Sequence, residues 1–124
     1  MHPLKRSWRI LAVLLLLASL PACADPWTSA DTARQAIFTG LAVVDWAQTR
    51  RIARQPVYYE MNPVLGSHPS VGQVDAYFAG AIVGHAAVSY LLPAGWRAGW
   101  QYVWIGIEAQ KTYHNRSIGL RFAF

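Results

Sequence analysis

The feature that most limits the fold of this chain is an apolar stretch over residues 76–92, which carries no charge and one conspicuously polar side chain, His85. A surface helix of a soluble domain has a polar side that faces water, and this stretch has none. A helix that crosses a membrane needs ~20 mostly apolar residues. Ser70 and Gln73 have the spacing of a capping box, which starts a helix shortly before the stretch. We therefore predict a membrane helix over residues 71–92.

The composition agrees with a membrane environment. Of the 124 residues, 54% are hydrophobic and 14% are charged, and the chain has six Trp and six Tyr. The net charge of +5 would suit a nucleic-acid partner if the basic residues formed one patch, but they bracket the apolar segments instead. These bracketing residues are Lys5, Arg6, Arg9, Arg50, Arg51, Arg54, Lys111, Arg116 and Arg121. We expect membrane lipid, and no nucleic acid, as a partner.

Residues 1–24 have the pattern of an export signal, with a basic start, a short apolar run and an A-x-A site at residues 22–24. The residues before Cys23 also resemble a bacterial lipobox, in which the cysteine is lipidated and becomes the first mature residue. Pro21 departs from the usual lipobox pattern. Three outcomes stay open, namely cleavage after the A-x-A site, lipidation at Cys23 and an uncleaved anchor. Each of them places Asp25 on the periplasmic side of the inner membrane.

Two further helices are expected on either side of the apolar stretch. Ser29–Arg54 has a capping residue before it and Asp31 in its first turn, but its apolar part, residues 36–47, is short for a span. Residues 96–114 form the third helix, which opens with aromatic side chains typical of a membrane interface. Prolines and glycines make residues 55–72 a loop.

The last segment, residues 115–124, alternates apolar and other residues with the period of a strand. An apolar strand ending in Phe124 is also typical of outer-membrane β-barrels, but a stretch that is apolar on every face argues against that class. The fold predicted for residues 25–124 is therefore a single all-α domain. It is a small membrane bundle of about three helices that follows the signal segment and ends in a short extended tail.

The basic residues also orient the bundle. They follow the first and third helices, and loops rich in Lys and Arg stay on the cytoplasmic side. The mature N-terminus is then periplasmic, which agrees with the export signal. Gly80 and Gly84 form a small-x-x-x-small pattern on the second helix, which permits close contact with another helix of the same or a partner protein.

Polar residues inside the expected helices are the candidate site. Spacing places Asp45 with Gln48 and Thr49 on one helix face, and Glu108 with Asn115 on another. Asp45 and Glu108 lie at similar depth in the bundle, and His85 lies about one helical turn away. Together with Glu60 and Asn62 from the loop, these residues could form one pocket. It would bind a divalent metal through Asp45, His85 and Glu108, or a proton. The alternative is that they only hydrogen-bond one another between helices.

Two motifs connect the first helix with the loop, namely Asp45-x-x-Gln48-Thr49 and Glu60-x-Asn62-Pro63-x-Leu65-Gly66. They resemble a D-x-x-Q-T and E-x-N-P-x-L-G arrangement in small uncharacterised bacterial membrane proteins. The resemblance implies a membrane location and assigns no catalytic role to any residue.

Three functional hypotheses follow, and no reaction is identified. The first is a structural or interaction component of the bacterial envelope. The second is a membrane-embedded metal-dependent hydrolase or proton-coupled carrier that uses the polar pocket. The third is a lipid-anchored periplasmic domain, in which the short helices form an ordinary core.

Overall fold

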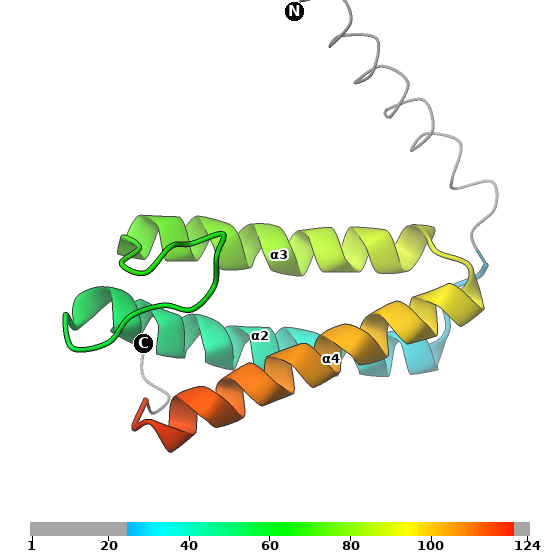
Figure 1. Ribbon diagram of the computed structural model, residues 1–124. Helices are drawn as coiled ribbons and strands as arrows, with labels where there is room; N and C mark the ends of the chain where they lie inside the picture. The colour runs from blue at the N-terminus through cyan, green and yellow to red at the C-terminus, as the bar shows by residue number, and fades with distance from the viewer. Residues whose placement is uncertain (1–24, 121–124) are drawn as a thin grey trace, which may run out of the picture.

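The computed structural model describes residues 25–120, which form three α-helices and no β-strand (Figure 1). The helices are α2 (Ser29–Arg54), α3 (Val71–Leu91) and α4 (Ala94–Ser117). The prediction of an all-α fold is confirmed. The signal segment and Cys23 lie outside the described residues.

Local capping explains where α2 and α3 begin. At the start of α2, the Asp31 backbone N–H donates to Thr28 Oγ1 (3.2 Å) and the Thr28 N–H donates to Asp31 Oδ2 (2.9 Å). At the start of α3, Ser70 and Gln73 exchange the same two bonds, at 2.9 and 3.1 Å. Each box satisfies backbone donors that a helix start leaves free. The capping box predicted at Ser70 is confirmed.

The end of α4 differs from the sequence prediction. Residues 115–117 belong to the helix, so the extended tail expected from residue 115 onward is wrong for this part of the chain. The helix ends at Ser117, and Gly119 just beyond it has a φ of +97° that only glycine adopts without strain. The Leu120 N–H then donates to the Asn115 carbonyl (2.9 Å), and the Leu120 side chain is buried. Residues 121–124 lie outside the described residues.

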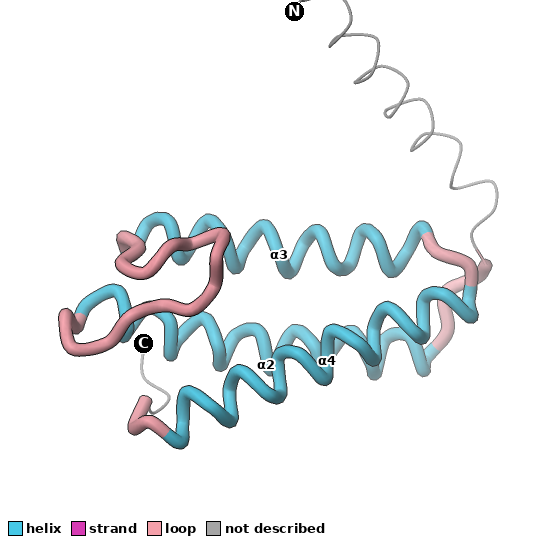
Figure 2. Tube along the Cα trace, viewed as in Figure 1, coloured by secondary structure: helices cyan, strands magenta, loops and turns pink. Residues whose placement is uncertain are grey.

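The three helices form an open bundle with α2 between the other two. In Figure 1, α3 runs alongside α2 while α4 crosses it obliquely, and both helices contact α2 more extensively than they contact each other. A two-residue connection joins α3 to α4. The long connection, residues 55–70, is drawn in pink in Figure 2 and returns the chain from the end of α2 to the start of α3. The C-terminal ends of α2 and α4 therefore lie at the same end of the bundle (Figure 1).

The polarity of the interior is the most unusual property of this bundle. Buried polar residues are at least as prominent as buried apolar ones. The polar set is Asp31, Asp45, Gln48, Thr49, His85, Ser89, Arg97, Gln101 and Glu108, and the apolar set is Phe38, Ala42, Ala47, Ile52, Val74, Phe78 and Leu120. Large apolar and aromatic side chains are exposed on the helices instead, including Ile37, Val83, Val88, Tyr90, Trp96, Tyr102, Val103 and Tyr113. Among the described helices, α3 alone has the length and apolar composition to cross a membrane.

Candidate polar sites between the helices

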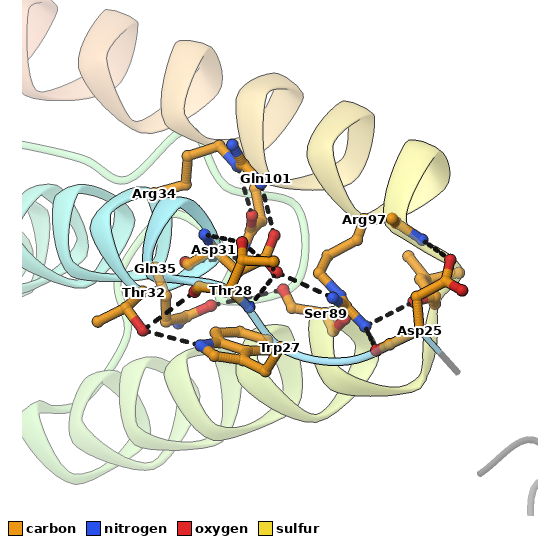
Figure 3. Close-up of polar contacts among 12 residues, drawn as sticks. Asp25, Trp27, Thr28, Asp31, Thr32, Arg34, Gln35, Ser89, Arg97 and Gln101 are labelled. Carbon is orange, nitrogen blue, oxygen red and sulfur yellow. Dashed lines mark hydrogen bonds and ion pairs between the residues drawn. The ribbon is translucent and has the colours of Figure 1, made fainter.

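Arg97 holds the first polar cluster together, at the end where α2 begins and α3 stops (Figure 3). Its side chain is fully buried, with 0% exposed. Nε donates to the Ser89 carbonyl (2.7 Å), Nη1 donates to Asp31 Oδ2 (2.9 Å), and Nη2 donates to the Asp25 and Leu92 carbonyls (2.7 and 3.0 Å). One guanidinium thus ties three segments together, a role that the local sequence pattern around Arg97 does not indicate.

Asp31 is the acidic partner in this cluster. Asp31 Oδ1 also accepts a hydrogen bond from Arg34 Nη2 (2.5 Å), and Arg34 Nε donates to Gln101 Oε1 (2.7 Å). Asp31 lies in the first turn of α2, outside the apolar part of that helix. Its burial alone would raise the pKa of the carboxyl, but hydrogen bonds from Thr28 and the Arg97 guanidinium outweigh burial and lower this pKa to about 2. The cluster is therefore ionised and internally paired at neutral pH.

His85 lies in the middle of the bundle and away from the acidic residues expected beside it. Its Nδ1 is 2.9 Å from Gln35 Oε1, and its ring is stacked between Phe38 (3.6 Å between centroids) and Trp100 (5.5 Å). Gln35, which contacts His85, precedes Asp45 on α2. At a rise of 1.5 Å per residue, Gln35 and Asp45 are about 15 Å apart along the helix axis, so His85 is distant from Asp45.

The second polar cluster joins α2 to α4 near their C-terminal ends. Asn115 Nδ2 donates to Asp45 Oδ1 (3.0 Å) and to Gln48 Oε1 (3.1 Å), and Thr49 Oγ1 donates to Asp45 Oδ1 (3.3 Å). Glu108 faces the Asp45 carboxyl within hydrogen-bonding reach. The structure therefore brings five of the sequence-derived site residues into one cluster.

Lys111 is a member of this cluster that the sequence analysis treated only as a flanking basic residue. Its Nζ lies 3.4 Å from Glu108 Oε1, one turn along α4. The i, i+3 spacing of a Glu and a Lys was the available signal for this pair. An ammonium group beside the carboxylates disfavours a divalent cation at the same place.

The loop residues Glu60 and Asn62 mainly organise their own turn. Glu60 Oε1 accepts the Met61 and Asn62 backbone N–H groups (3.0 and 2.9 Å), and Asn62 Oδ1 accepts the Val64 N–H (2.9 Å). The contact made by Asn62 is an Asx turn, as the Asn-Pro sequence indicates. Glu60 still lies within electrostatic range of Asp45.

The metal site expected from Asp45, His85 and Glu108 is not assembled. Within residues 25–120, no three His, Cys, Asp or Glu side chains come together as a ligand set. The physical reason is that His85 points into the aromatic layer between Phe38 and Trp100, whereas the two acids meet nearer the other end. Depth estimated from helical rise placed the three residues at neighbouring levels, but it did not fix the faces on which they lie.

A third polar contact links α2 to α3. Asp75 Oδ1 accepts the Trp46 indole N–H (2.7 Å) and Arg50 Nη1 (2.7 Å). Beside this contact, a surface hollow of about 380 Å³ is lined by Val64, Leu65, Gln73, Ala76 and Tyr77.

These features define a class, an all-α three-helix bundle with a polar, hydrogen-bonded interior. No family model, curated protein or solved structure matches the chain. The resemblance to small bacterial membrane proteins therefore remains a prediction.

Proposed function

We propose that this chain is a small integral protein of the bacterial inner membrane that acts as a structural or interaction component of the envelope. The observation that carries the proposal is the distribution of polarity, because many polar side chains are buried between the helices while many large apolar side chains are exposed on them. In water this arrangement would expose an extensive apolar surface, which soluble monomers avoid. In a bilayer the same surface contacts lipid.

The charged residues that make α2 and α4 less apolar than α3 agree with this proposal. Asp45 and Glu108 are almost completely buried, and both point to the interface of the two helices. Asp31 and Arg97 are buried and paired with each other. Ionisable groups within membrane proteins normally face the bundle interior and find partners there. Composition alone therefore underestimates how apolar the outer faces of these helices are.

The charges at the helix ends support an orientation. Arg51 and Arg54 lie in the last turn of α2, and His114 and Arg116 lie in the last turn of α4. Both helices end on the same side of the bundle (Figure 1). The positive-inside rule places that side in the cytoplasm and the start of α2 in the periplasm.

An open face of α3 supports the interaction role. Gly80 and Gly84 are exposed, and a Cβ atom added at either position would have no neighbour within 4 Å. Ala76 continues this face one turn earlier and is also exposed. We call these three residues the small-residue face. It would let the backbone of a second transmembrane helix approach closely, either from another copy of this chain or from an envelope partner.

Alkaline carbonate extraction of bacterial membranes tests the location, with the native chain and Cys23→Ala compared side by side. An integral protein stays in the membrane pellet in both cases. Release of both proteins would overturn the proposal. Retention of the native chain with release of the Cys23→Ala variant would also overturn it, in favour of a lipid-anchored periplasmic domain.

A further inference from the structure

We propose that Asp45 and Glu108 form a proton-binding site, in which the two carboxyl groups share one exchangeable proton and Lys111 balances the remaining negative charge. This inference rests on the geometry of the second polar cluster. It does not depend on the membrane location, so the extraction experiment can fail while the proton site stands.

The first step is burial. Asp45 is 4% exposed and Glu108 is 5% exposed, so water does not solvate either carboxyl freely. Two ionised carboxylates side by side in such a place repel each other and also lose their hydration. Retaining one proton between them removes the repulsion and leaves a single buried negative charge to be compensated.

The second step is the hydrogen bonding of the carboxyl oxygens. Asp45 Oδ1 accepts from Thr49 and Asn115, and Glu108 Oε1 faces the Lys111 ammonium. Glu108 Oε2 is buried, and no N–H or O–H donor within residues 25–120 reaches it. The group that faces Glu108 is the carboxyl of Asp45, and a hydrogen bond between two carboxyl groups exists only when one of them holds a proton.

The third step concerns which cation occupies the site. Lys111 already supplies one positive charge beside Glu108, and within residues 25–120 no third acidic or imidazole side chain completes a metal-ligand set with the two carboxyls. With one shared proton the pair carries a single negative charge, which the lysine balances. The other titratable groups that face the cluster are Glu60 from the long connection and Tyr77 from α3. This arrangement fits a proton and not a divalent metal.

The fourth step is access. The side chain of Lys111 is 36% exposed whereas that of Glu108 is 7% exposed, so the lysine lies between the pair and the solvent. A proton that leaves the pair passes to water on this side, and both carboxyl groups are then negative. Because Asp45 belongs to α2 and Glu108 to α4, the resulting repulsion acts directly across the contact between these two helices.

Infrared difference spectroscopy of the purified full-length protein tests the site through the C=O stretching band of a protonated carboxylic acid. The native chain should show this band at neutral pH, shift it in D₂O and lose it as the pH is raised. Asp45→Asn and Glu108→Gln should each abolish the band. Asp75→Asn is the matched control, since Asp75 is paired with Arg50, and this variant should keep the band.

Isotope labelling of the native chain keeps the test valid if a variant fails to fold. Labelling the side-chain carboxyls of all Asp and Glu residues with ¹³C should shift the frequency of the band, as expected for the C=O stretch of a carboxylic acid. Absence of the band in the native chain at neutral pH would overturn the inference. A band that persists unchanged in folded Asp45→Asn and Glu108→Gln would also overturn it.

Discussion

Arg97 Nη1 lies 2.9 Å from Asp31 Oδ2, and these two residues come from the beginning of α4 and the beginning of α2. Neither side chain reaches solvent appreciably. The pair closes one end of the bundle, because the same guanidinium also binds carbonyl groups at the end of α3.

Replacing Arg97 with alanine should destabilise the fold strongly. Removing one partner of a buried ion pair leaves the other charge without compensation, at a cost of about 3–5 kcal/mol. Arg116→Ala is the matched control, since Arg116 is exposed at the other end of the same helix. Thermal unfolding in detergent, followed by circular dichroism, measures both variants. Equal midpoints for the two would show that Arg97 does not hold the bundle.

The Asp31 carboxyl should make stability depend on acid pH. Its pKa is lowered from 3.8 to about 2 in the folded state, so its contribution is fully present above about pH 4. Protonation removes that contribution as the pH falls from about 4 towards 2. The native chain should therefore lose stability over this range more steeply than Asp31→Asn. Parallel unfolding midpoints of the two proteins between pH 5 and pH 2 would contradict this expectation.

Isoleucine at Gly80 and Gly84 should weaken self-association without harming the monomer. Space is available at both positions in the single chain, and isoleucine favours a helix more than glycine does. The branched side chain prevents close approach of a second helix. Gly106→Ile is the control, because Gly106 is equally open but lies on α4. Light scattering in mild detergent gives the oligomeric state, and a native chain that is already monomeric would contradict self-association through this face.

Replacing Asn115 with alanine should loosen the contact between α2 and α4. One amide group donates to both Asp45 and Gln48, so its loss leaves two acceptors short of a donor. Asp45 Oδ1 keeps the Thr49 hydroxyl as a donor, but Gln48 Oε1 becomes unpaired, and leaving a buried acceptor unpaired costs about 1–3 kcal/mol. His114→Ala changes the neighbouring exposed position and should have little effect. The two unfolding midpoints in detergent decide the matter, and equal values would indicate that the Asn115 contacts contribute nothing.

The parts of the fold that sequence predicts well are those set by neighbouring residues. The limits of α2 and the capping box at Ser70 depend on side chains within four positions of one another, so their spacing in the chain is enough. Periodicity also placed Glu108 and Asn115 on one face of α4. The same reasoning fails from Asn115 onward, because the strand-like alternation there ignores that the helix continues to Ser117 and that the chain turns at Gly119.

Contacts between distant residues could not be read from the sequence in this way. The partner of Arg97 on α2 is 66 positions away, and nothing in the local pattern distinguishes a buried arginine from one in an exposed turn. His85 was assigned the correct helix and an approximate depth. The direction in which the His85 side chain points depends on how α2 and α4 are rotated about their axes, since Phe38 and Trp100 enclose its ring. The packing of the whole bundle sets the rotation of each helix, so the sequence pattern of one helix does not reveal it.

The inverted polarity of this bundle has a thermodynamic consequence. At the proposed location in a bilayer, lipid already covers the apolar faces before the helices meet, so their association removes little apolar surface from water. Side-chain packing together with hydrogen bonds and ion pairs across the interfaces then supplies the cohesion. Cohesion of this kind lacks the large heat-capacity change that accompanies apolar burial. The free energy of separating α2 from α4 should therefore vary almost linearly with temperature, and cooling should not weaken their contact.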